Sequence, residues 1–405
     1  MAKVTTPPEL KQSRFLVITG IGMFLTQIVS LMLAPILDAL ATEFDVSVAS
    51  AGQLAAVTFG AWAVSVISVG PISDSFGRRP VAVIGMTLLS FSIIASSFAP
   101  SFGVLLGLRV ITGLSGGMIP PNSMAAVADV MPTAKRAQAF GFMMAVASFS
   151  SVVGVPMIAV LASAGGWRLP FIVHGFLLLG CAVLQWFWFP KTSASTRGEF
   201  SFISRYKQMA SISLFRTTLM ANLLQRMAFY ATISYLAAYL ISEHGMSLGQ
   251  TAIPLAIVGI GVVIGSTMAG SVAALNRRAQ VVATCAVTGG LAAMLMFSVD
   301  LSPWGTVAIA LLGITFISIG WPTFLAISTE ISAPSQATAV GMLGASNQLG
   351  GVGGAAFGGA VLALGGFSTV GFFCLIAAIL SAAVLQVCMN GSKPVDQRSP
   401  GVSRQ

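Results

Sequence analysis

The chain of 405 residues is too apolar to be a water-soluble globular protein. Hydrophobic residues make up 56% of it, only 31 residues are charged (20 Lys and Arg, 11 Asp and Glu), and the mean hydropathy is +0.92. This composition indicates a membrane protein and excludes the soluble classes. The net charge of +9 does not indicate a nucleic-acid partner, because the cations are spread over the loops between apolar runs.

Twelve apolar runs along the chain are each long enough to cross a bilayer as a helix, which takes about 20 residues. Alternating β-barrel patterning is absent, and helices are then the remaining spanning structure. The predicted spans are 15–38, 51–71, 80–99, 102–128, 138–163, 169–190, 213–241, 250–272, 279–298, 303–328, 336–363 and 367–389. The sequence therefore predicts an all-α membrane protein with twelve transmembrane helices.

The positions of the cations predict the orientation, since Lys and Arg gather in cytoplasmic loops. Of the 20 cations, Arg168 alone falls on the opposite side and two, Arg109 and Arg226, fall inside spans, which leaves 17 on one side. Both termini are therefore expected in the cytoplasm, with the protein in the cell membrane, a bacterial inner membrane being the favoured location.

The longest polar connection divides the chain into two sets of six spans. We expect a first bundle over 1–190, a cytoplasmic linker over 191–212, a second bundle over 213–389 and a short cytoplasmic tail over 390–405.

Residues recur across this linker at an offset of about 200. The recurring positions are Gly70, Arg78, Arg79, Asp129 and Gly141 in the first half, with Gly270, Arg277, Arg278, Glu330 and Gly341 in the second. Six spans per half give both copies the same orientation, so we expect a parallel pseudo-repeat, as in transporters with a site between the halves. Chance similarity of glycine-rich helices is the alternative.

The stretch "GPISDSFGRRPVAVIG" places charges between the second and third spans. Gly70, Asp74, Gly77, Arg78 and Arg79 satisfy the pattern G-x-x-x-D-x-x-G-R-R/K, and the loop resembles the signature of the major facilitator superfamily. The resemblance extends over essentially the whole chain.

This resemblance implies a gating latch at the cytoplasmic side. In the family the aspartate, here Asp74, sits at a helix N-terminus across the interface between the halves, where its charge is favourable. The first arginine, Arg78, reaches an acid at the cytoplasmic end of the fourth span, here Asp129. The alternative is that the arginines only follow the positive-inside rule. Ala274 occupies the Asp74 position in the second half, so the latch is expected to be degenerate there.

The fifth span bears on the branch of the family. Gly141, Ser150, Gly154 and Pro156 partly match the pattern G-x8-G-x3-G-P-x2-G-G of drug/proton antiporters, without its last glycine pair. The segment from Gly154 to Phe171 is also similar to twelve-span sugar and drug efflux members. These resemblances imply export of drugs, metabolites or sugars with proton antiport. Alternatively, the small residues only permit close helix packing.

Intramembrane polar residues are candidates for a substrate cavity. Arg226 lies about 15 Å along its helix from Arg216, near the bilayer midplane. A lone arginine there is costly unless it faces water, an anion or helix carbonyls. Asn222 and Tyr230 share its stripe and Gln225 lies beside it. We interpret these four residues as a cavity wall, with pairing to carbonyls as the alternative.

Helix 1 supplies the first half's candidates. Thr26, Ser30 and Asp38 share a stripe, and Asp38 is expected at a depth similar to Arg109. A nearby arginine would lower the pKa of Asp38, so this pair is our candidate for proton coupling. A solvated loop position for Asp38 is the alternative.

Other function classes find little support. Ser115 in "GLSGG" fits G-x-S-x-G, but that elbow needs a strand-to-helix turn, so we expect no enzyme. No metal-ligand cluster, Walker loop or dinucleotide motif is present, so no cofactor is expected. The sequence favours a monomeric exporter in the lipid bilayer that binds a small molecule and protons. The alternative is a proton-coupled or facilitative importer of a small organic anion, and a non-transporting nutrient sensor is a third possibility.

Overall fold

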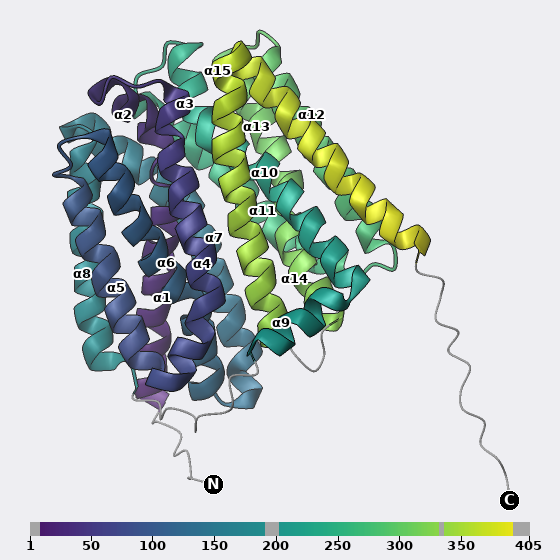
Figure 1. The fold of residues 1–405 in the computed structure, drawn as a ribbon. Helices are drawn as coiled ribbons and strands as arrows, with labels where there is room; N and C mark the ends of the chain where they lie inside the picture. Colours follow the sequence, from purple (N-terminus) through teal and green to yellow (C-terminus); the bar gives the residue numbers. More distant parts are fainter. Residues whose placement is uncertain (1–8, 191–201, 332–335, 392–405) are drawn as a thin grey trace, which may run out of the picture.

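The computed structural model describes residues 9–190, 202–331 and 336–391, and within these ranges all regular structure is helical (Figure 1). The elements in chain order are α1 (Glu9–Leu31), η1 (Ala34–Ile36), α2 (Leu37–Glu43), α3 (Val48–Ala51), α4 (Gln53–Phe76), α5 (Arg78–Ser96), α6 (Phe102–Val130), α7 (Thr133–Gly165), α8 (Arg168–Trp188), α9 (Phe202–Ser211), α10 (Ser213–Ser242), η2 (Gly249–Thr251), α11 (Ala252–Ala273), α12 (Arg278–Ser298), α13 (Pro303–Ser318), α14 (Gly320–Ile331) and α15 (Gln336–Gly391). The all-α prediction is confirmed.

Within the described ranges, ten helical segments are long and apolar enough to cross a membrane. One of them, Thr338–Gln386, has 49 residues, and at 1.5 Å per residue it would be about 74 Å long, more than one crossing needs. The backbone of α15 leaves helical geometry at Gly365 and Gly366, so α15 forms two spans. The remaining span is α10, whose middle is polar at Asn222, Gln225 and Arg226. The chain thus has the twelve transmembrane helices that its sequence predicts.

The spans form two six-helix bundles (Figure 1). Helices α1 to α8 make the first bundle and α10 to α15 the second, with α4 packed along α15 and α7 along α11 between them. The short helix α9 lies within the expected linker, of which residues 191–201 are outside the described ranges. Residues 392–405 of the expected tail are likewise outside them.

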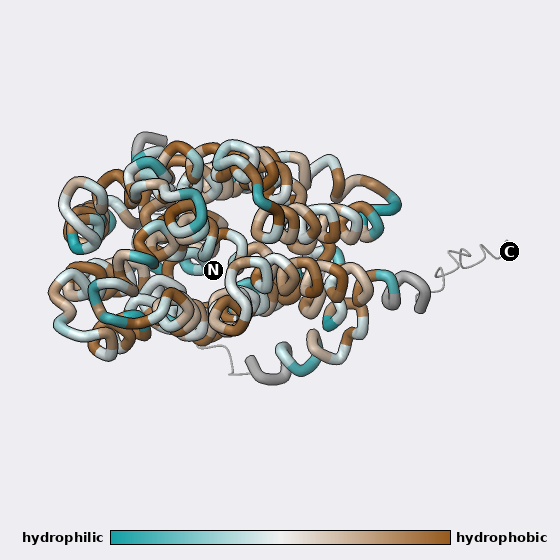
Figure 2. The backbone as a smooth tube through the Cα atoms, turned by 90° about the horizontal axis from the view of Figure 1, so that it is seen from above, coloured by the Kyte–Doolittle hydropathy of each residue, from teal (hydrophilic) through white to brown (hydrophobic). Residues whose placement is uncertain are grey.

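Large apolar side chains lie on the outer surface of both bundles. Phe98, Phe187 and Leu364 are 73%, 71% and 86% exposed, and Figure 2 shows hydrophobic residues along most of the tube. Soluble monomers rarely expose contiguous apolar surface of this extent. This surface faces lipid in a membrane-spanning protein.

The first span is interrupted, which corrects the expected continuous helix over 15–38. Helix α1 ends at Leu31, and a 3₁₀ turn containing Pro35 leads into α2. Proline has no backbone N–H to continue the α-helical ladder. Asp38 therefore does not continue the helical stripe of Thr26 and Ser30.

The two ends of the bundles carry opposite charge. The end we call the basic end carries Arg78 and Arg79 at the start of α5 and Arg277 and Arg278 at the start of α12. The end we call the acidic end carries Asp38, Glu43, Asp45, Glu243 and Asp300, with Arg168 as its cation among the described residues.

Candidate functional site

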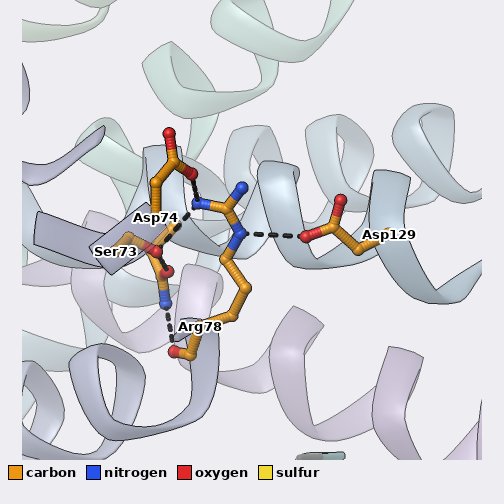
Figure 3. Close-up of polar contacts among 5 residues, drawn as sticks. Ser73, Asp74, Arg78 and Asp129 are labelled. Carbon is orange, nitrogen blue, oxygen red and sulfur yellow. Dashed lines mark hydrogen bonds and ion pairs between the residues drawn. The ribbon is translucent and has the colours of Figure 1, made fainter. Parts of the chain in front are cut away.

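The loop between α4 and α5 brings one arginine against two acids (Figure 3). Gly77 ends α4 with φ 90°, a conformation that disfavours any residue with a Cβ. The turn directs Arg78 back along α4, where Nη1 lies 2.6 Å from Asp74 Oδ1, and across to α6, where Nε lies 2.9 Å from Asp129 Oδ2. The sequence predicted this three-residue contact correctly.

Two further polar residues, which the sequence did not lead us to expect, complete this site. Arg78 Nη1 donates to Ser73 Oγ at 3.0 Å, and the Ser73 hydroxyl donates to Asn122 Oδ1. Asn122 Nδ2 in turn donates to the carbonyl oxygen of Arg78 at 2.9 Å. Asn122 is 1% exposed, so its amide is committed to this loop. We call Ser73, Asp74, Arg78, Asn122 and Asp129 the loop cluster.

The spacing along α6 was an available signal for Asn122. It precedes Asp129 by seven residues, which is about two helical turns, so both side chains lie on the same side of α6. A buried amide on the face of a predicted charge contact is expected to have a partner there.

The other two expected latch residues lie apart from the loop cluster. Arg79 donates to the backbone oxygen of Trp186 in α8, and its guanidinium lies 5.2 Å from the centroid of the Trp186 ring. Nothing lies within 4 Å of where a Cβ at Gly70 would be. Arg79 thus links α5 to α8 within the first bundle.

The second half repeats the ion pair but not the rest of the cluster. Arg278 Nη1 and Nη2 lie 2.8 and 2.5 Å from the two carboxylate oxygens of Glu330. Its third contact, at 3.3 Å, is to the backbone oxygen of Ala273. The residues that occupy the places of Ser73 and Asp74 are Ala273 and Ala274, so the cluster contains no second acid.

The packing of α4 against α15 shows what Asp74 faces. A Cβ at Gly359 would lie 2.8 Å from Ala49 O, one at Gly351 would lie 2.7 Å from Phe59 Cγ, and one at Gly344 would lie 3.2 Å from Val66 Cγ1. The residue numbers along α15 fall as those of their contacts toward α4 rise, so the two helices are antiparallel.

This register places Asp74 at the start of α15. Asp74 lies eight residues beyond Val66, and Gln336, the first residue of α15, lies eight residues before Gly344. The N-terminus of a helix carries unsatisfied N–H groups and a partial positive charge, which favour a carboxylate. The loop cluster therefore belongs to the first bundle, and its residue Asp74 is in register with a helix N-terminus of the second bundle.

Helices α7 and α11 form the equivalent interface on the other side. A Cβ at Gly259 would meet Ser151 O, and Ala274 lies fifteen residues beyond Gly259, while Arg136 lies fifteen residues before Ser151. Ala274 is therefore in register with the first turn of α7, which begins at Thr133. An alanine stands there in place of an acid.

The polar residues of α10 bond mainly within the second bundle. Gln225 Nε2 donates to Ile317 O, at the break between α13 and α14. Arg226 donates to Gln225 Oε1 from Nε at 3.0 Å and from Nη2 at 2.9 Å, and its guanidinium lies 4.5 Å from the Phe229 ring centroid. Gly320 has no Cβ, which leaves room for the Gln225 amide. Arg226 is 5% exposed, and its bonds are to neutral oxygens.

The other two expected cavity residues of α10 face α15. Asn222 Nδ2 donates to Ser346 Oγ at 3.1 Å, and Asn347 Nδ2 donates to Tyr230 Oη at 3.3 Å. Tyr230 also contacts the first bundle, because its ring centroid lies 4.6 Å from that of Phe59. Tyr230 is the residue of this set that reaches the interface between the bundles.

The structure separates the two coupling candidates. Arg109 is fully buried, donates to Ser96 Oγ and lies 5.2 Å from the Phe171 ring centroid. Asp38 is partly exposed and, among the described residues, makes no ion pair. The expected contact between them is therefore not formed.

The cavity candidates of the first bundle, Thr26 and Ser30, are buried and half-buried. Thr26 is fully buried, and its hydroxyl has no partner in the described part of the chain. Ser30 is half-buried and donates to Gln27 O at 2.7 Å.

The small residues of α7 divide into two groups. A Cβ at Gly154 would meet Ile28 of α1, so this glycine permits close packing, and Ser150 is buried and donates to Ala147 O at 2.6 Å. Nothing lies within 4 Å of where a Cβ at Gly141 would be, and Pro156 is half-buried within α7.

Ser115 does not have the surroundings of a catalytic nucleophile. Ser115 lies inside α6 and donates to Ile111 O at 2.6 Å, which is a helix back-bond and not a nucleophile elbow. No group of three or more His, Cys, Asp or Glu that could hold a metal occurs in the described ranges.

Two curated relatives match nearly the full length of the chain. The inner membrane transport protein YdhP of Escherichia coli O157:H7 is 26% identical over 394 residues, which cover 93% of this chain and 95% of YdhP. The gallate transporter of Pseudomonas putida is 25% identical over 398 residues, covering 88% and 86%.

Two other relatives match only a part of this chain. The uncharacterized MFS-type transporter YceJ of Bacillus subtilis is 24% identical over 249 residues, 60% of this chain and 63% of YceJ. The multidrug resistance protein Stp of Mycobacterium tuberculosis (strain CDC 1551) is 31% identical over 170 residues, 42% of this chain and 31% of Stp. The chain thus spans less than two thirds of the length of these two relatives.

The fold and the family agree. A solved bacterial homolog of the human lysosomal transporter Spinster superposes with a TM-score of 0.79 at 18% identity, covering 98% of this chain and 100% of that one. The family model described as Major Facilitator Superfamily matches residues 19–336 and again 218–404, as an internal repeat would produce. These matches are to transporters and not to enzymes. The chain is a multi-pass membrane protein that belongs to the Major Facilitator Superfamily.

Proposed function

We propose that the protein exports small organic molecules by alternating access in exchange for protons. The observation that supports this most is the register of Asp74 with the N-terminus of α15, while Arg78 pairs Asp74 with Asp129 in the first bundle. This register holds only while the basic ends of the two bundles lie together. Separation of those ends would break it.

The strength of the loop cluster suits a gate that opens in every cycle. Asp74 and Asp129 are 54% and 46% exposed, whereas Arg78 is 17% exposed. Exposed ion pairs contribute only about 0–1 kcal/mol. A contact of this size biases the equilibrium between two states without locking either one.

The remaining parts of the proposal concern direction and location. Export is supported by the multidrug resistance of Stp and by the partial antiporter pattern in α7. We place the protein as a monomer in a bacterial inner membrane, with the basic end and both termini in the cytoplasm, since cations gather there. Asp38, the partly exposed acid of the first span, is the candidate proton carrier.

A pH-gradient assay in inside-out vesicles tests export. The vesicle lumen is acidified, and organic cations, anions and sugars are added in turn. A proton antiporter for one class would dissipate the gradient when that class is added, and Asp74→Asn in the same membranes would not. A substrate that binds but leaves the gradient unchanged would contradict proton exchange.

The second candidate is import of a small organic anion. Arg109 and Arg226 are buried cations without an acidic partner among the described residues, and the gallate transporter is a near full-length relative. A buried arginine in a span costs at least about 2.5 kcal/mol unless it is compensated. A substrate carboxylate would compensate Arg226.

Arg226→Lys and Arg216→Lys separate the two candidates. Arg216 lies on the same helix, but it is exposed and bonds Ala210 O. Under import, Arg226→Lys would weaken the uptake of an aromatic carboxylate about tenfold, because the guanidinium fork is lost, and Arg216→Lys would not. Equal loss for anions and cations would assign Arg226 a structural role.

A further inference from the structure

A cavity of about 210 Å³ lies between the two bundles at the acidic end. Both bundles supply its walls, and it is distinct from the polar residues in the middle of α10. Its lining residues are Asp38, Val48, Ala238, Ser242, Leu362 and Phe367.

Asp38 is the one charged residue of this lining. It is partly exposed and has neither an ion pair nor a side-chain hydrogen bond among the described residues. The 3₁₀ turn before α2 moves it off the stripe of α1, beside the second bundle. The carboxylate is therefore available to a ligand.

Phe367 supplies an aromatic wall that its neighbours hold in place. Its ring centroid lies 5.2 Å from that of Tyr239 and 6.1 Å from that of Phe297. The face of an aromatic ring attracts a cation within about 6 Å, most strongly where water is partly excluded. Val48, Ala238 and Leu362 make the remaining surface apolar.

The acidic residues at the same end of the protein also favour a positively charged ligand. Glu43 pairs with Arg168 at 2.8 Å, but Asp45, Glu243 and Asp300 have no ion pair in the described ranges. Clefts lined by one sign of charge raise the local concentration of the opposite sign. A cation would thus be enriched at the mouth of the cavity, and an anion would be repelled.

We propose that this cavity binds a small organic cation, a quaternary ammonium or protonated amine with apolar substituents, with Asp38 as its counter-ion and Phe367 as its cation–π wall. A metal ion does not fit, because calcium needs six to eight oxygen ligands and the lining offers few. The volume is below the roughly 300 Å³ at which drug-sized sites begin, which indicates a compact ligand. The proposal is independent of transport direction, and it gives the carboxylate proposed above as the proton carrier a second role as counter-ion.

Equilibrium binding of radiolabelled tetraethylammonium to the full-length protein in nanodiscs of uncharged lipid tests the site without any gradient. We expect saturable binding that Asp38→Asn weakens about tenfold and Phe367→Leu about threefold. Asp45→Asn is the matched control, since it removes the same charge at the same end outside the cavity, and it should change the affinity less than twofold.

A second measurement locates the ligand and checks the fold. The thiol introduced by Val48→Cys should react with a cationic thiol reagent, and tetraethylammonium should slow that reaction. Of the four native cysteines, Cys181, Cys285 and Cys374 are buried, and Cys388 is replaced by serine in the labelling background. Three outcomes would each overturn the proposal: absence of saturable binding, equal weakening by Asp38→Asn and Asp45→Asn, or absence of protection of the introduced thiol in a Val48→Cys variant that binds. The binding assay and the pH-gradient assay are independent, so binding of the cation can be confirmed when export is contradicted, and export can be confirmed when binding is contradicted.

Discussion

The two interfaces between the bundles have the same packing but different electrostatics at the basic end. Along α4 and α15, Asp74 is in register with the start of a helix in the other bundle, and along α11 and α7 the equivalent position is Ala274. Both interfaces use glycines for close approach. The difference therefore lies in one carboxylate, placed where the helix dipole favours it on one side and missing on the other.

The arginines of the two halves show the same asymmetry. Arg78 contacts Ser73, Asp74 and Asp129, whereas Arg278 contacts Glu330 and a backbone oxygen. The pair of Arg278 with Glu330 closes within the second bundle and does not depend on the first. We infer that the α4–α15 side carries the gate and that the α7–α11 side is free to act as a hinge.

The largest effect is expected from Asp74→Asn. The substitution removes the charge that pairs with Arg78 at 2.6 Å and faces the N-terminus of α15. Asp74 is 54% exposed, so its ion pair contributes about 0–1 kcal/mol and its register with a helix N-terminus about 0.3–1 kcal/mol more. We therefore expect transport to fall about tenfold while insertion is unchanged. The transport rate is measured in vesicles, and the amount of protein in the membrane is measured by immunoblot.

Ala274→Asn is the control for Asp74→Asn. It places the same amide at the equivalent position of the α7–α11 interface, and transport should stay within about twofold. Normal transport in Asp74→Asn, or equal losses in both variants, would contradict the assignment of the gate to one side.

The next effect is expected from Asn122→Leu. Its amide bonds Ser73 and the carbonyl oxygen of Arg78 from a buried position. Leaving buried polar partners unsatisfied costs about 1–3 kcal/mol, so the melting temperature in detergent should fall by several degrees and transport several-fold.

Thr323→Val is the matched control for Asn122→Leu. Thr323 is the corresponding residue in the second half, but its hydroxyl bonds Ile319 O within its own helix. The thermal shift should be clearly smaller. If Thr323→Val and Asn122→Leu destabilise the protein equally, Asn122 has no special role in positioning Arg78.

The family resemblance implied the contact of Arg78 with Asp129, and the structure contains it. Asp74, Arg78 and Asp129 are charged residues next to loops, and charge is so rare in this chain that each one has a restricted set of partners. Asn122 was missed because a polar residue in an apolar run has many possible neighbours. Its spacing from Asp129 indicates the face of α6 on which it lies, but its partners are fixed by the angle between α4 and α6, which periodicity does not encode.

The positions of Asp38 and Arg226 depend on local breaks in helices. Asp38 was placed by counting along a continuous helix, and the turn at Pro35 makes that count wrong. Arg226 finds its carbonyl partner at Ile317 beside the break at Ile319, where α13 gives way to α14. Pro322, in the first turn of α14, has no N–H to bond Ser318 O and so disfavours a continuous helix there. A proline does not show which side chain takes the freed carbonyls, so the alternative of carbonyl pairing could be stated from the sequence but not located.

Ala274→Asp sharpens the comparison by adding an acid to the side that lacks one. The new carboxylate would lie in register with the first turn of α7, which contains Lys135 and Arg136. A charge at a helix N-terminus contributes about 0.3–1 kcal/mol, so the population with the basic ends together should rise about two- to fivefold. Distances between spin labels at the basic ends of α4 and α15 measure this, and an unchanged distribution would contradict the register.

The smallest effect is expected from Glu330→Gln. The pair is bidentate, but Glu330 is 56% exposed and Arg278 29% exposed, and both belong to the second bundle. An exposed pair contributes about 0–1 kcal/mol, and this one does not change when the bundles move. Transport should therefore stay within about twofold of the parent, whereas Asp129→Asn, which removes an anchor of the loop cluster, should reduce it more. A loss in Glu330→Gln as large as that in Asp74→Asn would mean that the second bundle's arginine also takes part in gating, and the division into gate and hinge would be abandoned.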